Sequence, residues 1–344
     1  MVKRSSYWDN VKFLLITFVV LGHFADYVSF SRMASATVLF IYSFHMPMFF
    51  LVSGLFLKYD DKHKLRIDKI LYFIFIGYAM KTAIYFIDKV SGNDPKWYWL
   101  SENNVPWYMF VMAGYLILVY VLKSVSFKIV LPVSIVISLL AGYSDSIGNF
   151  LCLSRFIVFF PFFFLGYSFI PEKAQAFFKR KYIKIFGSLS LLILGAIFLR
   201  FNDEIAPIFR PVFYARFPYS EMPYPQYGIL LRALQYFIAA AAICGMGAIT
   251  PIKRIKFITA AGSRTIAIYA IHYFILRLFV ALDIHMFLME RFSHFGAILW
   301  LILAVIVSCL LAIPLFNTIF LKLRQMISYF VERVERKFVR NKKL

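Results

Sequence analysis

The chain has 344 residues, of which 62% are hydrophobic and only 16% are charged, and its formal net charge is +21. Soluble domains have about 45–50% apolar and about 25% charged residues, so this composition excludes an ordinary soluble domain. The apolar residues recur in runs near the roughly 20 residues that a helix needs to cross a bilayer, which predicts an all-α, polytopic integral membrane protein.

The apolar runs predict ten transmembrane helices, at residues 10–29, 37–57, 69–88, 105–122, 128–143, 154–171, 183–200, 229–249, 265–283 and 297–320. If both termini and the even-numbered loops are cytoplasmic, 26 of the 38 Lys and Arg residues lie on that side. This asymmetry follows the positive-inside rule, so we expect both termini in the cytoplasm. The rule also accounts for the net charge, and no nucleic-acid partner is expected.

We expect residues 1–320 to form the transmembrane domain and residues 321–344 to form a basic cytoplasmic tail. The apolar positions Met326, Phe330, Val334 and Phe338 recur at helical spacing among basic residues. This pattern is typical of an amphipathic helix that lies on an anionic lipid surface. A segment that binds a partner protein is the alternative.

The first span carries polar side chains along one face. His23 follows Lys12 by eleven residues, which is about three helical turns and about 16 Å of rise. Asp9 lies three residues before Lys12, and Asp26 lies three residues after His23. Ionisable groups in hydrocarbon usually face a polar cavity, and a histidine can transfer a proton near neutral pH. The stripe therefore predicts a cation at the cytoplasmic end and a proton acceptor deeper in. A snorkelling lysine and a packing histidine are the structural alternative.

The second span carries His45 at a depth similar to that of His23, so the two histidines can meet if the first two helices pack as a hairpin. Pro47 lies one turn into this helix and favours a kink there. The small residues Ser53 and Gly54 follow and permit close approach of another helix.

Later spans contain further polar candidates, each with a structural alternative. Trp107 begins the fourth span, where an aromatic belt at the membrane surface is the simpler interpretation. Arg155 begins the sixth span and is interpreted as either functional or snorkelling. Arg264 directly precedes the ninth span, and His272 lies within it, eight residues or about two turns later.

The outer loop 201–228 is unusually rich in proline and tyrosine. It contains Pro207, Pro211, Pro218, Pro223, Pro225, Tyr214, Tyr219, Tyr224, Tyr227, Arg210 and Arg216. Proline restricts the backbone, and tyrosine rings offer flat faces for sugar rings. The loop is predicted to be either a sugar-binding surface or a rigid interfacial lid.

These motifs together resemble the membrane acyltransferase 3 family. Lys12-x10-His23 resembles its Arg/Lys-x10-His signature, and Phe44-His45-Met46-Pro47 through Ser53-Gly54 is similar to its second-helix motif. Pro106-Trp107-Tyr108, Arg155 to Tyr167, and Ile268-Tyr269-x-x-His272 follow in the expected order. The likeness covers roughly residues 8–320 and is closest to the fucose 4-O-acetylase-like branch. Many members have arginine where this chain has Lys12, which keeps the charge but loses the bidentate fork.

The resemblance implies an O-acetyltransferase of the bacterial cytoplasmic (inner) membrane. Its acyl-donor substrate would be cytosolic acetyl-CoA, and its acceptor a hydroxyl of a surface glycan or of a lipid-linked oligosaccharide precursor. His23 and His45 would be catalytic, and Lys12, Arg155 and Asp9 would bind the donor or stabilise an oxyanion. Five further residues would support the site: Asp26, Ser53, Trp107, Arg264 and His272. We expect no bound cofactor and no metal site, since no set of metal ligands is evident.

Two other classes of function remain open from the sequence. A proton-coupled glycan or lipid transporter or flippase would use His23 and His45 as a proton relay. A membrane scaffold would use them only for packing. The acceptor sugar, the hydroxyl position and the oligomeric state are left open by the sequence.

Overall fold

The structure is a computed structural model that describes residues 5–59 and 64–341. Helix is the only regular secondary structure in this part of the chain, apart from an isolated bridge between Ser101 and Phe150. The α-helices are α1 (Ser6–Tyr27), α2 (Arg32–Tyr42), α3 (His45–Leu55), α4 (Ile67–Val90), α5 (Trp107–Val121), α6 (Phe127–Leu140), α7 (Leu153–Ser168), α8 (Pro171–Phe178), α9 (Lys181–Arg200), α10 (Asn202–Tyr214), α11 (Gly228–Ile249), α12 (Lys256–Ala261), α13 (Thr265–Ala281), α14 (Ile284–Phe292), α15 (His294–Leu311) and α16 (Pro314–Asn341).

The helices confirm an all-α, multi-pass membrane protein. Five of the described helical segments are long and apolar enough to cross a bilayer, namely α1, α2 with α3, α4, α9 and the segment containing α11. Three bent pairs, α7 with α8, α13 with α14, and α15 with α16, raise the number to eight if each pair is one span. The helices α5 and α6 are apolar but shorter. Each predicted span thus overlaps a helix, while the count of ten stays a prediction.

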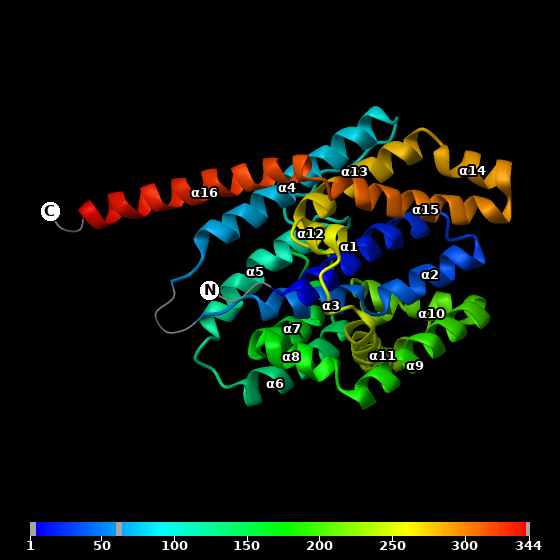
Figure 1. Cartoon of the computed structure of the whole chain (residues 1–344), viewed down its shortest axis with the longest axis horizontal. Helices are drawn as coiled ribbons and strands as arrows, with labels where there is room; N and C mark the ends of the chain where they lie inside the picture. Colours follow the sequence, from blue (N-terminus) through cyan, green and yellow to red (C-terminus); the bar gives the residue numbers. More distant parts are fainter. Residues whose placement is uncertain (1–4, 60–63, 342–344) are drawn as a thin grey trace.

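Helix α1 lies in the middle of the bundle (Figure 1), where it packs against α2, α3, α12, α13 and α15. Buried polar groups hold it in place at both ends. The Asn10 amide donates to the carbonyl oxygens of Pro251 and Lys253 at 2.9 and 3.0 Å. At the other end, Trp300 donates to the Phe24 carbonyl oxygen at 2.8 Å. The residues that carry the Lys12-to-His23 stripe are therefore fixed by their neighbours.

The second predicted span is not continuous, because a break at residues 43–44 separates α2 from α3. His45 is the first residue of α3, and Pro47 lies in its first turn, where a missing N–H costs no helical hydrogen bond. The Ser43 hydroxyl donates to the Phe40 carbonyl oxygen at 2.7 Å, so this carbonyl group beside the break has a hydrogen-bond partner. The interruption predicted at Pro47 therefore lies a few residues earlier, next to His45.

Helices α3 and α7 cross at two glycines. A Cβ atom on Gly54 would lie 2.1 Å from the Phe163 carbonyl oxygen, and one on Gly166 would lie 1.9 Å from the Leu51 carbonyl oxygen. Neither distance is possible, so each position requires glycine. The close approach predicted for Ser53-Gly54 is confirmed, and it locks the helix that carries His45 against the helix that carries Arg155.

The expected proline-rich loop 201–228 is largely helical, which corrects that expectation. Helix α10 contains Pro207 and Pro211, and two short 3₁₀ turns follow at Tyr219–Glu221 and Pro225–Tyr227. The two prolines are four residues apart, so their missing N–H donors lie on one side of the helix and leave the other side intact. The prolines therefore did not exclude a helix here.

The chain bends by 55° between α15 and α16, and α16 starts at Pro314, so it contains the end of the last predicted span and the described part of the expected tail. Its first part packs along α4, where Tyr72 donates to the Phe320 carbonyl oxygen at 3.2 Å. Its last part extends beyond the bundle (Figure 1), with Met326 and Phe330 exposed. Helix α1 begins and α16 ends on the same side of the molecule, while the cytoplasmic assignment of that side stays a prediction.

Candidate active site

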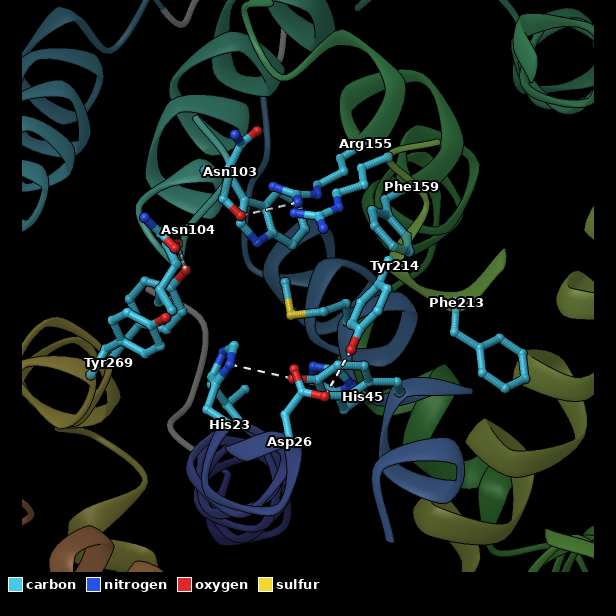
Figure 2. Close-up of a pocket in the computed structure, with 17 residues that line it drawn as sticks. His23, Asp26, His45, Asn103, Asn104, Arg155, Phe159, Phe213, Tyr214 and Tyr269 are labelled. Atoms are coloured by element: carbon cyan, nitrogen blue, oxygen red, sulfur yellow. Dashed lines mark hydrogen bonds between the residues drawn. The ribbon is translucent and has the colours of Figure 1, made fainter. Parts of the chain in front are cut away.

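A cavity of about 220 Å³ lies where α1, α2, α3, α5, α7, α10 and α13 converge. Five of the sequence-predicted site residues line it, namely His23, Asp26, His45, Trp107 and Arg155. Figure 2 shows His23 and Asp26 projecting from α1, with Arg155 and Asn103 across the cavity. We refer to this space as the histidine cavity.

The two predicted catalytic histidines lie on either side of Tyr42. The Tyr42 hydroxyl is 3.3 Å from Nδ1 of His23, and the ring centroids of Tyr42 and His45 are 4.9 Å apart. Nδ1 of His45 donates to the Ile41 carbonyl oxygen at 2.8 Å, since a carbonyl oxygen can only accept. A neutral His45 therefore has Nε2 as its free acceptor. The histidines share one cavity, with a phenol between them.

A third histidine lies behind His23. The rings of His23 and His272 are 5.5 Å apart, and His272 is fully buried. Nδ1 of His272 donates to the carbonyl oxygens of Ile268 and Tyr269, at 3.1 and 2.8 Å. Nε2 has no hydrogen-bond partner among the described residues. His272 therefore supports the ring of His23 from outside the cavity.

Helix α10 closes one side of the histidine cavity. Tyr214, its last residue, donates to Asp26 at 2.8 Å, as Figure 2 shows, and its ring lies 5.3 Å from that of Tyr42. Arg210 donates to the hydroxyls of Ser29 and Ser35 at 3.2 and 3.3 Å. These bonds hold α10 against the ends of α1 and α2, which favours the interpretation of this segment as a lid.

Arg155 is held at the cavity by the segment that precedes α5. Its guanidinium group lies 4.8 Å from the Trp107 ring and donates weakly, at 3.4 Å, to the carbonyl oxygens of Glu102 and Asn103. Only 6% of the residue is exposed. Lys81 pairs with the Glu102 carboxylate at 3.2 Å, and both side chains are nearly buried. This ion pair therefore fixes the segment that orients Arg155.

A second cavity, of about 270 Å³, contains the cationic end of the α1 stripe, and we refer to it as the lysine cavity. Lys12 lines it together with Lys69 and Arg324, and Lys12 pairs with Asp9 at 2.7 Å. The other lining residues are mostly apolar or aromatic; Ser53 is among them and bonds to the Tyr108 hydroxyl at 2.9 Å. The polar stripe on α1 thus reaches two cavities, with Lys12 in one and His23 in the other.

Tyr269 lines both cavities and forms part of the wall between them. Its hydroxyl donates to the Val105 carbonyl oxygen, and its ring lies 5.2 Å from that of Tyr108. Val105 belongs to the segment that the Lys81–Glu102 ion pair holds. The same segment therefore positions both Tyr269 and Arg155.

Arg264 lies outside both cavities. It precedes α13 and donates to the Ala312 carbonyl oxygen at 2.8 Å, where α15 ends. This contact satisfies a carbonyl group that the helix end leaves without a partner. The structure therefore gives Arg264 a role in holding two helices together, away from the site.

Several cavity residues were not predicted as site residues from the sequence: Tyr42, Asn103, Asn104, Tyr273 and, in the support of Arg155, Lys81 and Glu102. Tyr42 lies three residues before His45, a spacing that could have indicated it. The other residues come from segments whose position depends on the tertiary fold. Within the described residues, no three His, Cys, Asp or Glu side chains gather where they could hold a metal ion.

Comparison with known proteins identifies the family. A family model described as an acyltransferase domain, that of acyltransferase 3, matches residues 5–317. Neither the curated proteins nor the solved structures contain a significant match to the chain. The matched range includes every helix that lines the histidine cavity. The chain belongs to the acyltransferase 3 family of membrane acyltransferases.

Proposed function

We propose that this protein transfers an acetyl group from cytosolic acetyl-CoA to a hydroxyl of a surface polysaccharide or its lipid-linked precursor, in a bacterial cytoplasmic membrane. One observation carries the proposal. In a membrane acyltransferase, a basic cavity and a cavity with histidine and arginine lie on either side of Tyr269. Such an arrangement suits a long donor that is bound at one end and reacts at the other.

The lysine cavity suits the phosphate end of the donor. Lys12, Lys69 and Arg324 line it, and cationic side chains attract phosphate oxygens and hydrogen-bond to them. His23 lies eleven residues from Lys12 on α1, about 16 Å along the helix axis. The flexible pantetheine arm would cover this distance, pass Tyr269 and bring the thioester carbonyl close to His23.

His23 would act as the general base. It takes the proton of the acceptor hydroxyl while that oxygen forms a bond to the thioester carbonyl carbon. The carbon–sulfur bond then breaks, and the proton passes from His23 to the sulfur of coenzyme A. Arg155 would stabilise the negative charge on the carbonyl oxygen, and Tyr42 would keep the His23 ring in position next to His45. The transfer is direct, without an acyl-enzyme.

The test compares His23→Gln with His285→Gln, which changes a histidine of α14 outside both cavities. Mass spectrometry of surface glycans would measure O-acetyl groups in cells that produce equal amounts of each protein. We expect His23→Gln to reduce acetylation by about 10²–10⁴-fold and the control to keep it. Undiminished acetylation in His23→Gln would refute this role.

A photoreactive acetyl-CoA analogue tests the donor separately. We expect it to label peptides of α1, α3 or α5 in the purified protein, and unlabelled acetyl-CoA to compete. If glycans cross the membrane in a proton-dependent way and no labelling occurs, the protein is a transporter instead, and the proposed function is wrong.

A further inference from the structure

The histidine cavity contains more positive charge than the transfer of an acetyl group requires. Arg155 and Arg216 both line it, while Asp26 is its one lining carboxylate among the described residues. The Glu102 carboxylate, which lies nearby, is already paired with Lys81 at 3.2 Å. The wall of the cavity therefore has two guanidinium groups and one carboxylate.

Neither arginine of the cavity has an acidic partner within ion-pair distance in the part of the chain that the structure describes. Arg155 donates only to two backbone carbonyl oxygens, and Arg216 lies over the rings of Phe217 and Tyr214, at 4.5 and 5.7 Å. The Nε atom of Arg216 is buried and has no hydrogen-bond partner among those residues. The two guanidinium groups are near enough to repel each other, and Asp26 attracts Arg216 without lying within ion-pair distance of it.

The backbone around Arg216 is built to present this side chain beside Arg155. Ala215 ends α10 with φ at +54°, a left-handed conformation that is unfavourable for any residue with a Cβ atom. Its carbonyl oxygen accepts a hydrogen bond of 2.8 Å from Ser154, the neighbour of Arg155. Both residues are buried. Strained backbone that is fixed by a buried hydrogen bond is typical of functional sites.

Charged groups that lie in a cavity without an ion-pair partner are costly, and they are often kept for a function. In the mechanism proposed above, one guanidinium group is sufficient for the oxyanion, and the phosphates of the donor lie in the lysine cavity. The charge of Arg216 is therefore left for the other substrate. Asp26 offsets only one of the two positive charges of the cavity, so an anion that enters the histidine cavity would balance the other.

We propose, on the basis of the function proposed above, that the acceptor is an anionic glycan whose carboxylate or phosphate oxygens bind Arg216. Arg155 remains available for the oxyanion. The sugar anchored at Arg216 would then present its hydroxyl to His23, the general base in the same cavity. The two sources of the anion are an acidic sugar and the phosphate of a lipid-linked sugar.

Binding measurements with the purified protein in lipid nanodiscs test this proposal, with direct titration by calorimetry as the readout. The probes are methyl glucuronide against methyl glucoside for the carboxylate, and farnesyl diphosphate against farnesol for the phosphate. We expect one anionic probe to bind at least about tenfold more tightly than its neutral counterpart, as a charged hydrogen bond would provide. The arm that shows the preference identifies the source.

Variants distinguish a specific site from general attraction. Arg216→Gln should abolish the preference, Arg216→Lys should keep part of it, and Arg291→Gln, an exposed charge on α14, should leave it unchanged. Equal binding of charged and neutral probes in both arms, or a preference that survives Arg216→Gln, would overturn the proposal. His23→Gln should keep the preference whatever happens to transfer, so a failure of the proposed function is recognised separately.

Discussion

The two cavities have similar volumes, about 220 and 270 Å³, yet they differ in how their charges are held. In the lysine cavity, Arg324 is exposed and Lys12 keeps 27% of its side chain accessible. In the histidine cavity, Arg155 is 6% exposed and His45 is 5% exposed, and hydrogen bonds hold their neighbours. Cations that are accessible to solvent tolerate a ligand that is bound in several ways, while buried and hydrogen-bonded groups impose one geometry.

This difference indicates a division of work within one helix bundle. Solvent-screened charges contribute little to precise positioning but attract polyanions from solution. Preorganised groups in a site shielded from water contribute most to the stabilisation of a transition state. We therefore expect substitutions in the histidine cavity to change the rate of transfer, and substitutions in the lysine cavity to change the affinity for the donor.

The largest effect is expected from the ion pair that supports the histidine cavity. Lys81→Met leaves the nearly buried Glu102 carboxylate without its cation, which should cost about 3–5 kcal/mol of unfolding free energy. Denaturant unfolding of the purified protein measures this change. Lys81→Met with Glu102→Gln should recover part of the loss. A single variant as stable as the parent would mean that the pair does not hold this segment.

Arg155→Gln tests directly whether the histidine cavity determines the rate of transfer. The loss of one preorganised donor to an oxyanion typically lowers kcat by about 10²–10³-fold. Arg155→Lys should keep the charge but lose the planar fork that lies over Trp107, and should recover only part of the rate. Steady-state acetyl transfer at saturating acetyl-CoA measures both. Unchanged kcat in Arg155→Gln would remove Arg155 from the reaction.

Lys12→Ala should affect the donor and leave the chemistry intact. The side chain is partly exposed and already paired with Asp9, so its contribution is at most about 1 kcal/mol, or about fivefold in the KM for acetyl-CoA. Added salt should reduce the difference between variant and parent. A fall in kcat at constant KM would contradict the assignment of Lys12 to donor binding.

We expect Arg264→Gln to have the smallest effect on function. The side chain lines neither cavity and bonds to the Ala312 carbonyl oxygen, so the variant should lose about 1 kcal/mol of stability and keep its kcat and KM. Thermal unfolding and transfer assays on one preparation test both statements. A selective loss of transfer at unchanged stability would mean that Arg264 takes part in the reaction.

Much of the architecture was predictable because the bilayer imposes length and polarity on each segment. Every predicted span overlaps a helix, and Lys12 and His23 lie along α1 as their spacing predicted. The interruption predicted at Pro47 lies before His45, and the helix at 202–214 was not predicted, because apolar periodicity does not show where a helix is interrupted or what packs on proline-rich segments. The membership of the acyltransferase 3 family is confirmed.

Local rules of hydropathy, charge and helical spacing were enough to identify the class of protein, the order of its helices and the polar stripe on α1. They could not show that Tyr42 lies between two histidines, that Tyr269 lines two cavities, or that Ser154 bonds to the Ala215 carbonyl oxygen next to Arg216. These contacts join residues from different helices. They depend on how glycine crossings such as that of Gly54 and Gly166 bring helices together, and this is a property of packing in three dimensions.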